Sequence, residues 1–285
     1  MAELLIGAPV SSALDSETKK RADALISREI VPTLAIVRVG ENVADISYER
    51  AACKKAAALG INAVLHTLPS DTDADSFLKL ISQINSDKSV HGVLVLRPLP
   101  KHLEDSSYIS LLSPSKDIDG ITPKMMSALY SGAKPFFAPC TARACMEIIF
   151  HYGIELKGAR VAVIGRSLVV GRPLAMLLLH EDATVTICHS KTDDLKSVCK
   201  SSSLVLSAIG RAEALGSEYF SPGQSVIDVG VSFSDAKNKL CGDIDLDSVL
   251  DIVKAVTPFK GGVGSVTASV LARQVIEACE NINSV

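Results

Sequence analysis

Short apolar runs alternate with longer segments of mixed polarity along most of the chain. In the first half, the runs at 32–40, 61–69 and 91–100 are rich in Val, Ile and Leu. The segments between them, 45–60 and 73–85, have the length and the mixed polarity of amphipathic helices. Nearly continuous apolar strands separated by helices are typical of a parallel sheet that is covered on both faces. The pattern therefore predicts a series of alternating strands and helices.

A second series of the same kind follows a break rich in Gly, Pro and Ser around 113–140. Its predicted strands are 159–165, 183–190, 204–210, 224–230 and 255–258, and its predicted helices are 171–181 and 193–202. One more helix is expected to open near Ser16, and the amphipathic tail at 265–282 forms another that either unit can accept. Two α/β units joined by a break predict two domains around a cleft, a place where ligands commonly bind.

Composition narrows the class of protein. The chain has 285 residues, of which 47% are hydrophobic and 21% charged, enough apolar content for a substantial core. Its formal net charge is −3, and its Lys and Arg residues are scattered. This argues against nucleic acid or an anionic membrane as the main partner. No secretory signal is visible, and no run approaches the roughly 18 apolar residues of a membrane span.

The cysteines point to a reducing compartment. There are seven of them, an odd number, and no pair has C-x-x-C spacing. Reduced thiols in a cytoplasmic protein are therefore expected instead of a disulfide framework. No metal site is expected, because the six His residues do not pair with the Cys residues at zinc spacings.

The stretch VAVIGRSLVVGRP at 161–173 has the form of a strand, a glycine turn and a helix, with the pattern G-x-S-x-x-x-G. Gly165 would allow the tight turn out of the strand. Gly171 would allow backbone and helix to approach a pyrophosphate closely, with free N–H groups at the helix start facing the phosphates. Ser167 lies between them. The pattern alone also fits a turn in which the glycines only serve packing.

The end of the next strand indicates which dinucleotide would bind. An NAD site usually has Asp or Glu there to accept from the ribose 2′-OH, whereas an NADP site prefers cations and hydroxyls. The side chains at this strand end are those of His189, Ser190 and Lys191. Arg166 also projects from the turn, so the balance favours NADP. Asp193 and Asp194 follow shortly, which leaves NAD open.

The chain resembles the methylenetetrahydrofolate dehydrogenase/cyclohydrolase family over nearly its whole length. The similar stretches, in order, are 39–61, 92–100, 116–120, 139–142, 165–173, 183–192, 227–231, 242–245 and 256–267. The resemblance implies a folate site in the cleft, NADP on a second, Rossmann-like domain with a doubly wound parallel sheet, and a homodimer. It also implies that the C-terminal helix returns to the first domain. The expected domains are then 1–118 plus 266–285, which binds folate, and 119–265, which binds NADP.

The resemblance assigns roles to individual residues. Tyr48 would pack on the folate and Asp119 would bind the pterin, so these two are the expected catalytic residues. Pro98 and Gly262 join them as expected substrate-binding residues. The expected cofactor-binding residues are Gly165, Arg166, Ser167, Gly171, His189, Ser190 and Val231. His189 is also a candidate general base, although its place beside Ser190 favours nucleotide contact.

Two positions depart from the family pattern. The Lys that serves the hydrolytic step, four residues after the Tyr, is Ala52 here, and the Gln that positions it is Leu96, followed by Arg97. Hydride transfer needs alignment more than a base. Hydration and ring opening need a positioned acid/base, whose contribution is typically ~10²–10⁴-fold. Lys55 lies on the same helix face and is the alternative base. In the later glycine-rich loop, Lys260 and Ser265 replace two prolines.

These residues together predict an NADP-dependent methylenetetrahydrofolate dehydrogenase in one-carbon folate metabolism, with weak or absent cyclohydrolase activity. One alternative is the full bifunctional dehydrogenase/cyclohydrolase, with Lys55 or another group as base. The other is a catalytically silent protein that binds folate or nucleotide. Outside the site, Cys140 is expected to be buried, with Thr141 after it as the N-cap of a helix.

Overall fold

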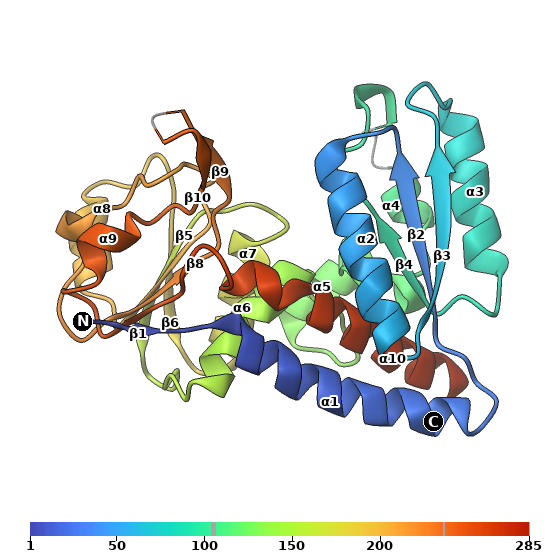
Figure 1. Ribbon diagram of the computed structural model, residues 1–285, viewed down its shortest axis with the longest axis horizontal. Coiled ribbons are helices and arrows are strands. Elements are labelled where there is room, and N and C mark those ends of the chain that lie inside the picture. Colours follow the sequence, from blue (N-terminus) through green and yellow to red (C-terminus); the bar gives the residue numbers. More distant parts are fainter. Residues whose placement is uncertain (104–106, 236, 285) are drawn as a thin grey trace. The chain divides into compact units, whose positions relative to one another are not determined.

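The computed structural model describes residues 1–103, 107–235 and 237–284. Two compact units make up the chain (Figure 1). Unit 1 comprises Met1–Ser12 and Pro139–Thr267, and unit 2 comprises Ala13–Ala138 and Ala268–Val285. Each unit is therefore assembled from two stretches of the chain that are far apart in sequence.

Unit 2 contains a parallel sheet in the order β3-β2-β4. Its strands are β2 (Thr33–Val39), β3 (Asn62–Leu68) and β4 (Gly92–Val95), and the helices between them are α2 (Val43–Ala58) and α3 (Ala74–Ser86). Figure 1 shows α2 and α3 on opposite sides of the sheet. Alternate residues of β2, such as Ala35 and Val37, belong to the same core cluster as Phe77 and Ile81 of α3. The predicted strands and helices of this half are confirmed.

The rest of unit 2 consists of helices. The short ones are η1 (Lys101–Leu103), α4 (Ser107–Leu111), η2 (Pro114–Lys116) and α5 (Pro123–Ser131). Two long helices, α1 (Gly7–Ile26) and α10 (Thr267–Asn283), lie mostly in this unit. Helix α5 lies within the break at 113–140, for which no helix was predicted. Its start has Thr122 as N-cap, accepting from the Met125 N–H, followed by Pro at the first turn.

Unit 1 contains a parallel sheet whose described strands run in the order β1-β11-β8-β7-β5-β6. These strands are β1 (Glu3–Leu4), β5 (Arg160–Ile164), β6 (Thr184–Cys188), β7 (Leu204–Ser207), β8 (Ser225–Asp228) and β11 (Ala255–Val256). The chain leaves β5 for β6 on one side and then crosses to β7 on the other. The carboxyl ends of β5 and β7 thus form a topological switch point, where such sheets bind ligands. The expected Rossmann-like doubly wound sheet is confirmed.

Helices cover both faces of this sheet. They are α6 (Cys140–His151), α7 (Gly171–His180), α8 (Leu195–Lys200) and α9 (Leu246–Val249), with η3 (Ser217–Tyr219) and η4 (Val263–Ser265). Ala162 and Ile164 of β5 share a core cluster with Cys199 of α8 and Val249 of α9. A separate antiparallel hairpin is formed by β9 (Ser232–Ser234) and β10 (Lys239–Cys241).

Two helix starts differ from expectation. Helix α1 begins at Gly7 instead of near Ser16. Its first turn is fixed by contacts with a distant loop, because the Gly7 N–H donates to the Gly261 carbonyl at 2.7 Å and the Ser11 hydroxyl donates to the Ser265 carbonyl at 2.8 Å. Helix α6 begins at Cys140, so Thr141 is inside the helix and is not its N-cap. Cys140 is buried, as expected.

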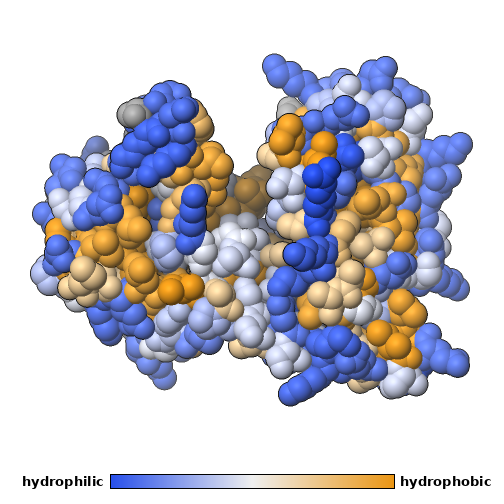
Figure 2. Space-filling view, in the orientation of Figure 1, coloured by the Kyte–Doolittle hydropathy of each residue, from blue (hydrophilic) through white to orange (hydrophobic). Residues whose placement is uncertain are grey.

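The surface of both units is mixed in polarity. Figure 2 shows apolar surface broken up by polar side chains over each unit. Of the part of the chain that the structure describes, no helix is long and apolar enough to cross a membrane. Among those same residues, no group of three or more His, Cys, Asp or Glu side chains is placed to hold a metal ion.

Candidate active site

The glycine turn after β5 needs both of its glycines. Gly165 has a φ of +125°, a backbone conformation that residues with a side chain rarely adopt. A Cβ on Gly165 would also lie only 2.5 Å from the Ala208 carbonyl oxygen. A Cβ on Gly171 would overlap the Gly165 carbonyl. The start of α7 therefore packs directly on the turn.

Ser167 and the two arginines lie around this turn. The Ser167 hydroxyl oxygen accepts from the Val170 N–H at 3.1 Å and from the Gly171 N–H at 3.4 Å, so it holds the first turn of α7. The Arg172 Nε donates to the Arg166 carbonyl at 3.1 Å. Both arginine side chains are exposed. The turn thus carries exposed positive charge beside the N-terminus of α7, a combination that favours an anionic group.

The end of β6 forms a second, adjoining turn. The His189 N–H donates to the Thr192 hydroxyl at 2.8 Å, and His189 Nδ1 accepts from the Lys191 N–H at 3.1 Å. This contact places the proton of the neutral ring on Nε2. Ser190 and Lys191 are exposed at the tip of the turn. Since β5 and β6 are adjacent parallel strands, their end loops lie at the same edge of the sheet.

Two buried aspartates shape the loops that follow β7 and β8. Asp228 accepts from the N–H groups of Gly230, Asp243 and Ile244, each at 3.0 Å. Asp243 accepts from the Ser207 hydroxyl at 2.8 Å, and from the N–H groups of two residues in the loop after β7, Ile209 at 2.8 Å and Arg211 at 2.9 Å.

The glycines of IDVGV (227–231) and GDID (242–245) allow each aspartate to pack against the other loop. A Cβ on Gly230 would collide with the Asp243 carboxyl group, and a Cβ on Gly242 would collide with that of Asp228. Each carboxylate therefore packs against the other loop's glycine. Val231, three residues after β8 in a loop held in this way, is 62% exposed. The expected cofactor residues of unit 1 thus all lie in loops at the carboxyl ends of β5, β6 and β8 or at the start of α7.

In unit 2, helix α2 carries the first expected folate residue. Asn42 caps the helix by accepting from the Ala44 N–H at 2.8 Å. Tyr48 is half-buried one turn before Ala52, which is 3% exposed. The residue beside Tyr48, Glu49, is buried in an ion pair with Arg38 of β2, with 2.8 Å between Oε2 and Nε. This pair joins α2 to the sheet below it.

Lys55 is held by a different partner. Its ammonium forms an ion pair with the carboxylate of Asp15 on α1. About a quarter of each side chain remains exposed. For Lys55 to act as a base beside Tyr48, this ion pair would have to be broken.

In the segment KDIDG (116–120), Lys116, Asp117 and Gly120 hold the local structure in place. The Lys116 ammonium is buried and donates to the carbonyls of Ile84, Asn85 and Asp87 at the end of α3, at 2.6 to 3.0 Å. Burial lowers the pKa of Lys116, and the Asp87 charge opposes this effect.

The neighbouring aspartate is buried as well. Asp117 accepts from the N–H groups of Ile121 at 3.1 Å and Thr122 at 2.7 Å. Burial raises the pKa of Asp117, although these N–H donors oppose the rise. Gly120 has a φ of +61°, and a Cβ there would press on the Phe137 carbonyl. These contacts fix the turn from which Asp119 projects.

Asp119 lies next to Arg97. The Arg97 Nη2 donates to Asp119 Oδ2 at 3.1 Å, and the two side chains are 30% and 22% exposed. Arg97 comes two residues after β4, and Leu96 between them is 6% exposed. Pro98 follows and is exposed. Unit 2 therefore brings Asp119 and Pro98 to one edge of its sheet, the carboxyl end of β4.

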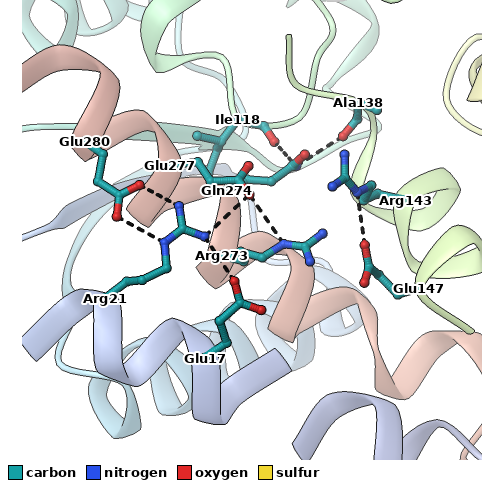
Figure 3. Close-up of polar contacts among 10 residues, drawn as sticks. All are labelled: Glu17, Arg21, Ile118, Ala138, Arg143, Glu147, Arg273, Gln274, Glu277 and Glu280. Atoms are coloured by element: carbon teal, nitrogen blue, oxygen red, sulfur yellow. Dashed lines mark hydrogen bonds and ion pairs between the residues drawn. The ribbon is translucent and has the colours of Figure 1, made fainter. Parts of the chain in front are cut away.

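A buried glutamine of α10, Gln274, contacts the backbone of Ile118, the residue before Asp119 (Figure 3). Gln274 is 1% exposed. Its side-chain amide donates to the carbonyl of Ile118 at 2.5 Å and to that of Ala138 at 3.1 Å. Arg21 of α1 joins α10 nearby through Glu280, with Nε to Oε1 at 3.0 Å and Nη2 to Oε2 at 2.5 Å. Gln274 was not singled out from the sequence, since an isolated Gln in an amphipathic helix carries no signal.

Gly262 belongs to unit 1, in the loop after β11. Its carbonyl accepts from the Ser265 N–H at 3.1 Å and from the Ser265 hydroxyl at 2.7 Å. A Cβ on Gly262 would overlap the Pro258 carbonyl, so the glycine is required for the loop to close. Lys260, which replaces a proline of the family pattern, is exposed in the same loop.

Sequence reasoning noted Arg97 but missed its role as the partner of Asp119. Arg97 lies near the end of a predicted strand, whereas Asp119 lies in the break at 113–140, so no local pattern paired the two residues. The contacts of Asp228 and Asp243 with each other's loops were also missed, because they join segments that are not neighbours along the chain.

Comparison with known proteins covers both units. Residues 5–119 match the family model described as tetrahydrofolate dehydrogenase/cyclohydrolase, catalytic domain, and residues 139–283 match the one described as the NAD(P)-binding domain of the same family. The chain is 45% identical over 284 residues to the bifunctional protein FolD of Carboxydothermus hydrogenoformans, which covers 99% of each chain.

Solved structures agree. The bifunctional enzyme FolD of Campylobacter jejuni is similar with a TM-score of 0.95 and 34% identity over 99% of each chain. The Trypanosoma brucei methylenetetrahydrofolate dehydrogenase-cyclohydrolase, solved with NADP cofactor and an inhibitor, gives a TM-score of 0.92 and 31% identity over 98% of each chain.

Proposed function

The chain belongs to the tetrahydrofolate dehydrogenase/cyclohydrolase family, and from this premise we propose that it oxidises methylenetetrahydrofolate to methenyltetrahydrofolate with NADP and has little or no cyclohydrolase activity. One observation carries the second half of the proposal. The positions of the hydrolytic Lys and Gln hold Ala52 and Leu96, which are apolar and buried.

The two steps make different demands on the protein. In the dehydrogenase step a hydride leaves the bridging carbon for the nicotinamide, and the cation that remains is stabilised by its own two nitrogens. The protein's part is to align the reactants, with Tyr48 packing on the folate and Asp119 binding the pterin. In the cyclohydrolase step water must lose a proton and a ring nitrogen must gain one. Neither Ala52 nor Leu96 can move a proton.

The preference for NADP rests on the charges at the glycine turn. Arg166 and Lys191 are exposed on the neighbouring end loops of β5 and β6, with the Ser190 hydroxyl beside them. A 2′-phosphate gains charge-assisted hydrogen bonds from such groups, whereas a free ribose 2′-OH prefers a carboxylate.

The direct test follows both reactions with one purified protein. Methylenetetrahydrofolate is supplied with NADP or with NAD, and nicotinamide reduction and methenyl product are measured together. Hydrolysis of methenyltetrahydrofolate is then compared with and without the protein. We expect NADP-linked oxidation, with enzymatic hydrolysis at least 100-fold slower than oxidation, an estimate of about the size of a lost acid/base contribution. Comparable rates would refute the proposed loss, and ligand binding without reduction would show a silent protein.

A gain-of-function pair sharpens the assignment. The double substitution Ala52→Lys with Leu96→Gln restores the family's residues at both positions. We expect it to raise methenyltetrahydrofolate hydrolysis by at least about tenfold over the unchanged chain. Leu96→Gln alone is the matched control and should leave hydrolysis unchanged. A folded double variant with no gain would mean that other residues limit the hydrolytic step.

Full bifunctionality is the second candidate, because the curated relative from Carboxydothermus hydrogenoformans is named a bifunctional protein. It requires a base other than the residue at position 52, and Lys55 is the nearest amine on α2. Lys55→Met separates the two candidates. Measurable hydrolysis that disappears in this variant, with oxidation retained, would establish Lys55 as the base.

Assembly and compartment are further parts of the proposal. The family resemblance supports a homodimer, which sedimentation of the purified protein tests. The seven free thiols support a reducing compartment such as the cytoplasm.

A further inference from the structure

Arg97 is a charged residue at the edge of the proposed folate site with no role assigned so far. The preceding residue is fixed to the sheet, since the Leu96 N–H donates to the Val37 carbonyl at 2.9 Å. Arg97 therefore starts from a rigid backbone at the end of β4. Its guanidinium reaches Asp119, the residue expected to bind the pterin, at 3.1 Å.

The contact with Asp119 leaves other N–H donors of the Arg97 guanidinium for a ligand. A guanidinium carries five N–H donors in a planar fork, and the described contact with Asp119 uses Nη2 alone. The Arg97 side chain is 30% exposed, so it is neither fully buried nor free in solvent. Arg97 can therefore donate to a ligand while it keeps its bond to Asp119.

A buried aromatic residue, Tyr108, lies near the Arg97 charge. Tyr108 of α4 is 3% exposed and packs edge-on against Phe77, with 5.5 Å between ring centroids. Burial raises the pKa of Tyr108, and the nearby Arg97 charge opposes this rise. Arg97 is thus near enough to a buried aromatic residue for its charge to act on the phenol.

The pair has a chemical complement in the pterin ring. One edge of a reduced pterin presents three groups in a row, namely the 2-amino group, the N3–H and the 4-oxo group. The first two are donors and the third is an acceptor. A carboxylate with a guanidinium beside it presents acceptors next to a donor. Asp119 and Arg97 therefore match this edge as a unit.

We propose that Arg97 donates a hydrogen bond to the 4-oxo group of the folate while Asp119 accepts from the 2-amino group and N3–H. Arg97 is then a specificity-determining residue that distinguishes a 4-oxopterin from a 4-aminopterin. The inference rests on the proposed function for the identity of the ligand. The inference adds a second residue that recognises the pterin ring, Arg97, at a position where the family pattern has Leu.

The test uses two ligands and four proteins. Dissociation constants for tetrahydrofolate and for its 4-amino analogue are measured by calorimetry with the unchanged chain, with Arg97→Leu and with Arg97→Lys. The unchanged chain should prefer the 4-oxo ligand. Arg97→Leu should reduce that preference roughly tenfold or more, the size of one charge-assisted hydrogen bond, and Arg97→Lys should restore part of it. Lys101→Leu removes an exposed charge four residues away and should leave the preference unchanged.

The ratio between ligands separates recognition from stability. A variant that bound both ligands more weakly by the same factor, or both more tightly, would overturn the inference, because Arg97 would then act on the fold or obstruct the site. Thermal melting of each variant shows that it is folded. If the unchanged chain bound no tetrahydrofolate at all, the proposed function itself would fail. Normal binding with an unaltered ratio in Arg97→Leu would refute only the role of Arg97.

Discussion

At the scale of single residues, position relative to the sheet decides what a charge can do. Arg166 and Arg160 are both exposed arginines next to or within β5. Arg166 follows the carboxyl end of the strand, where the glycine turn lies, whereas Arg160 begins the strand at the opposite edge. Only the first is placed to meet a ligand at the switch point.

Arg166→Ser should therefore change cofactor choice. Loss of a cation that binds the 2′-phosphate is expected to raise the KM for NADP by about 10- to 100-fold, while the KM for NAD stays within about twofold. Steady-state kinetics with both cofactors measure this. Arg160→Ser is the matched control and should alter neither value. Equal weakening of NADP and NAD by Arg166→Ser would contradict the assignment.

At the scale of elements, side chains hold helix ends and loops in place. Lys116 donates to three carbonyls at the end of α3, which have no partner within the helix. Asp228 and Asp243 brace the loops that follow two neighbouring strands. In both cases a buried ionisable side chain forms hydrogen bonds with backbone groups that have no partner within a helix or strand.

Removing the α3 cap tests this role. Lys116→Met keeps much of the side-chain volume but removes the ammonium donor from the carbonyls of Ile84 and Asn85, whereas the Asp87 carbonyl still accepts from the Val90 N–H at 3.2 Å. We expect the free energy of unfolding to fall by about 2 to 4 kcal/mol, measured by urea unfolding. Lys88→Met removes an exposed lysine close to the same helix end and should cost less than about 0.5 kcal/mol. Equal effects of the two substitutions would show that Lys116 is not a cap.

Asp228 predicts a pH dependence of stability. Burial is the main cause that raises the pKa of Asp228 from 3.8 to about 6, with N–H donors opposing and the Asp243 charge adding to the rise. Between these values the folded chain holds a proton that the unfolded chain releases. The free energy of unfolding contributed by this group therefore falls as pH rises through that window.

The comparison with Asp228→Asn isolates the effect, because Asn does not titrate. The stability advantage of the unchanged chain over the variant should shrink from about pH 4 to about pH 7, by an amount on the order of 1 to 3 kcal/mol. Urea unfolding of both proteins across this range measures it. An advantage that grew with pH would mean that the pKa of Asp228 is lowered by folding.

At the scale of the whole molecule, neither unit is a continuous stretch of chain. The first residues belong to unit 1, where β1 pairs with β11, more than 250 positions away, with Glu3 opposite Ala255. Leu5 follows β1 and is 1% exposed, whereas Leu4 is 41% exposed. The N-terminal segment is thus anchored by one buried side chain and by the strand pairing.

Leu5→Ala should destabilise unit 1, although Leu5 is remote in sequence from the stretch Pro139–Thr267 that makes up most of that unit. The lost burial and the cavity are expected to cost about 3 kcal/mol, whereas Leu4→Ala should cost less than about 1 kcal/mol. Urea unfolding in the absence of cofactor compares the two. A similar small loss in both variants would show that the N-terminal segment contributes little to the unit.

The amino-acid sequence alone was enough to predict the alternation of strands and helices and the glycine turn after β5. These features depend on residues that are neighbours along the chain, because burial repeats with the period of each element and a turn needs its glycines in fixed order. The start of α1 escaped this reasoning, since a loop more than 250 residues away determines where that helix begins.

Which side chains come into contact followed from the packing of the helices and strands. Arg97 and Asp119 are 22 positions apart, Asp228 and Ile244 are 16 apart, and Gln274 reaches a carbonyl 156 positions away. Such pairings depend on how the elements pack, and no local pattern encodes them. The identity of the residues could be read from the chain, but their partners, and hence the role proposed for Arg97, followed from the packing that places them within hydrogen-bond distance.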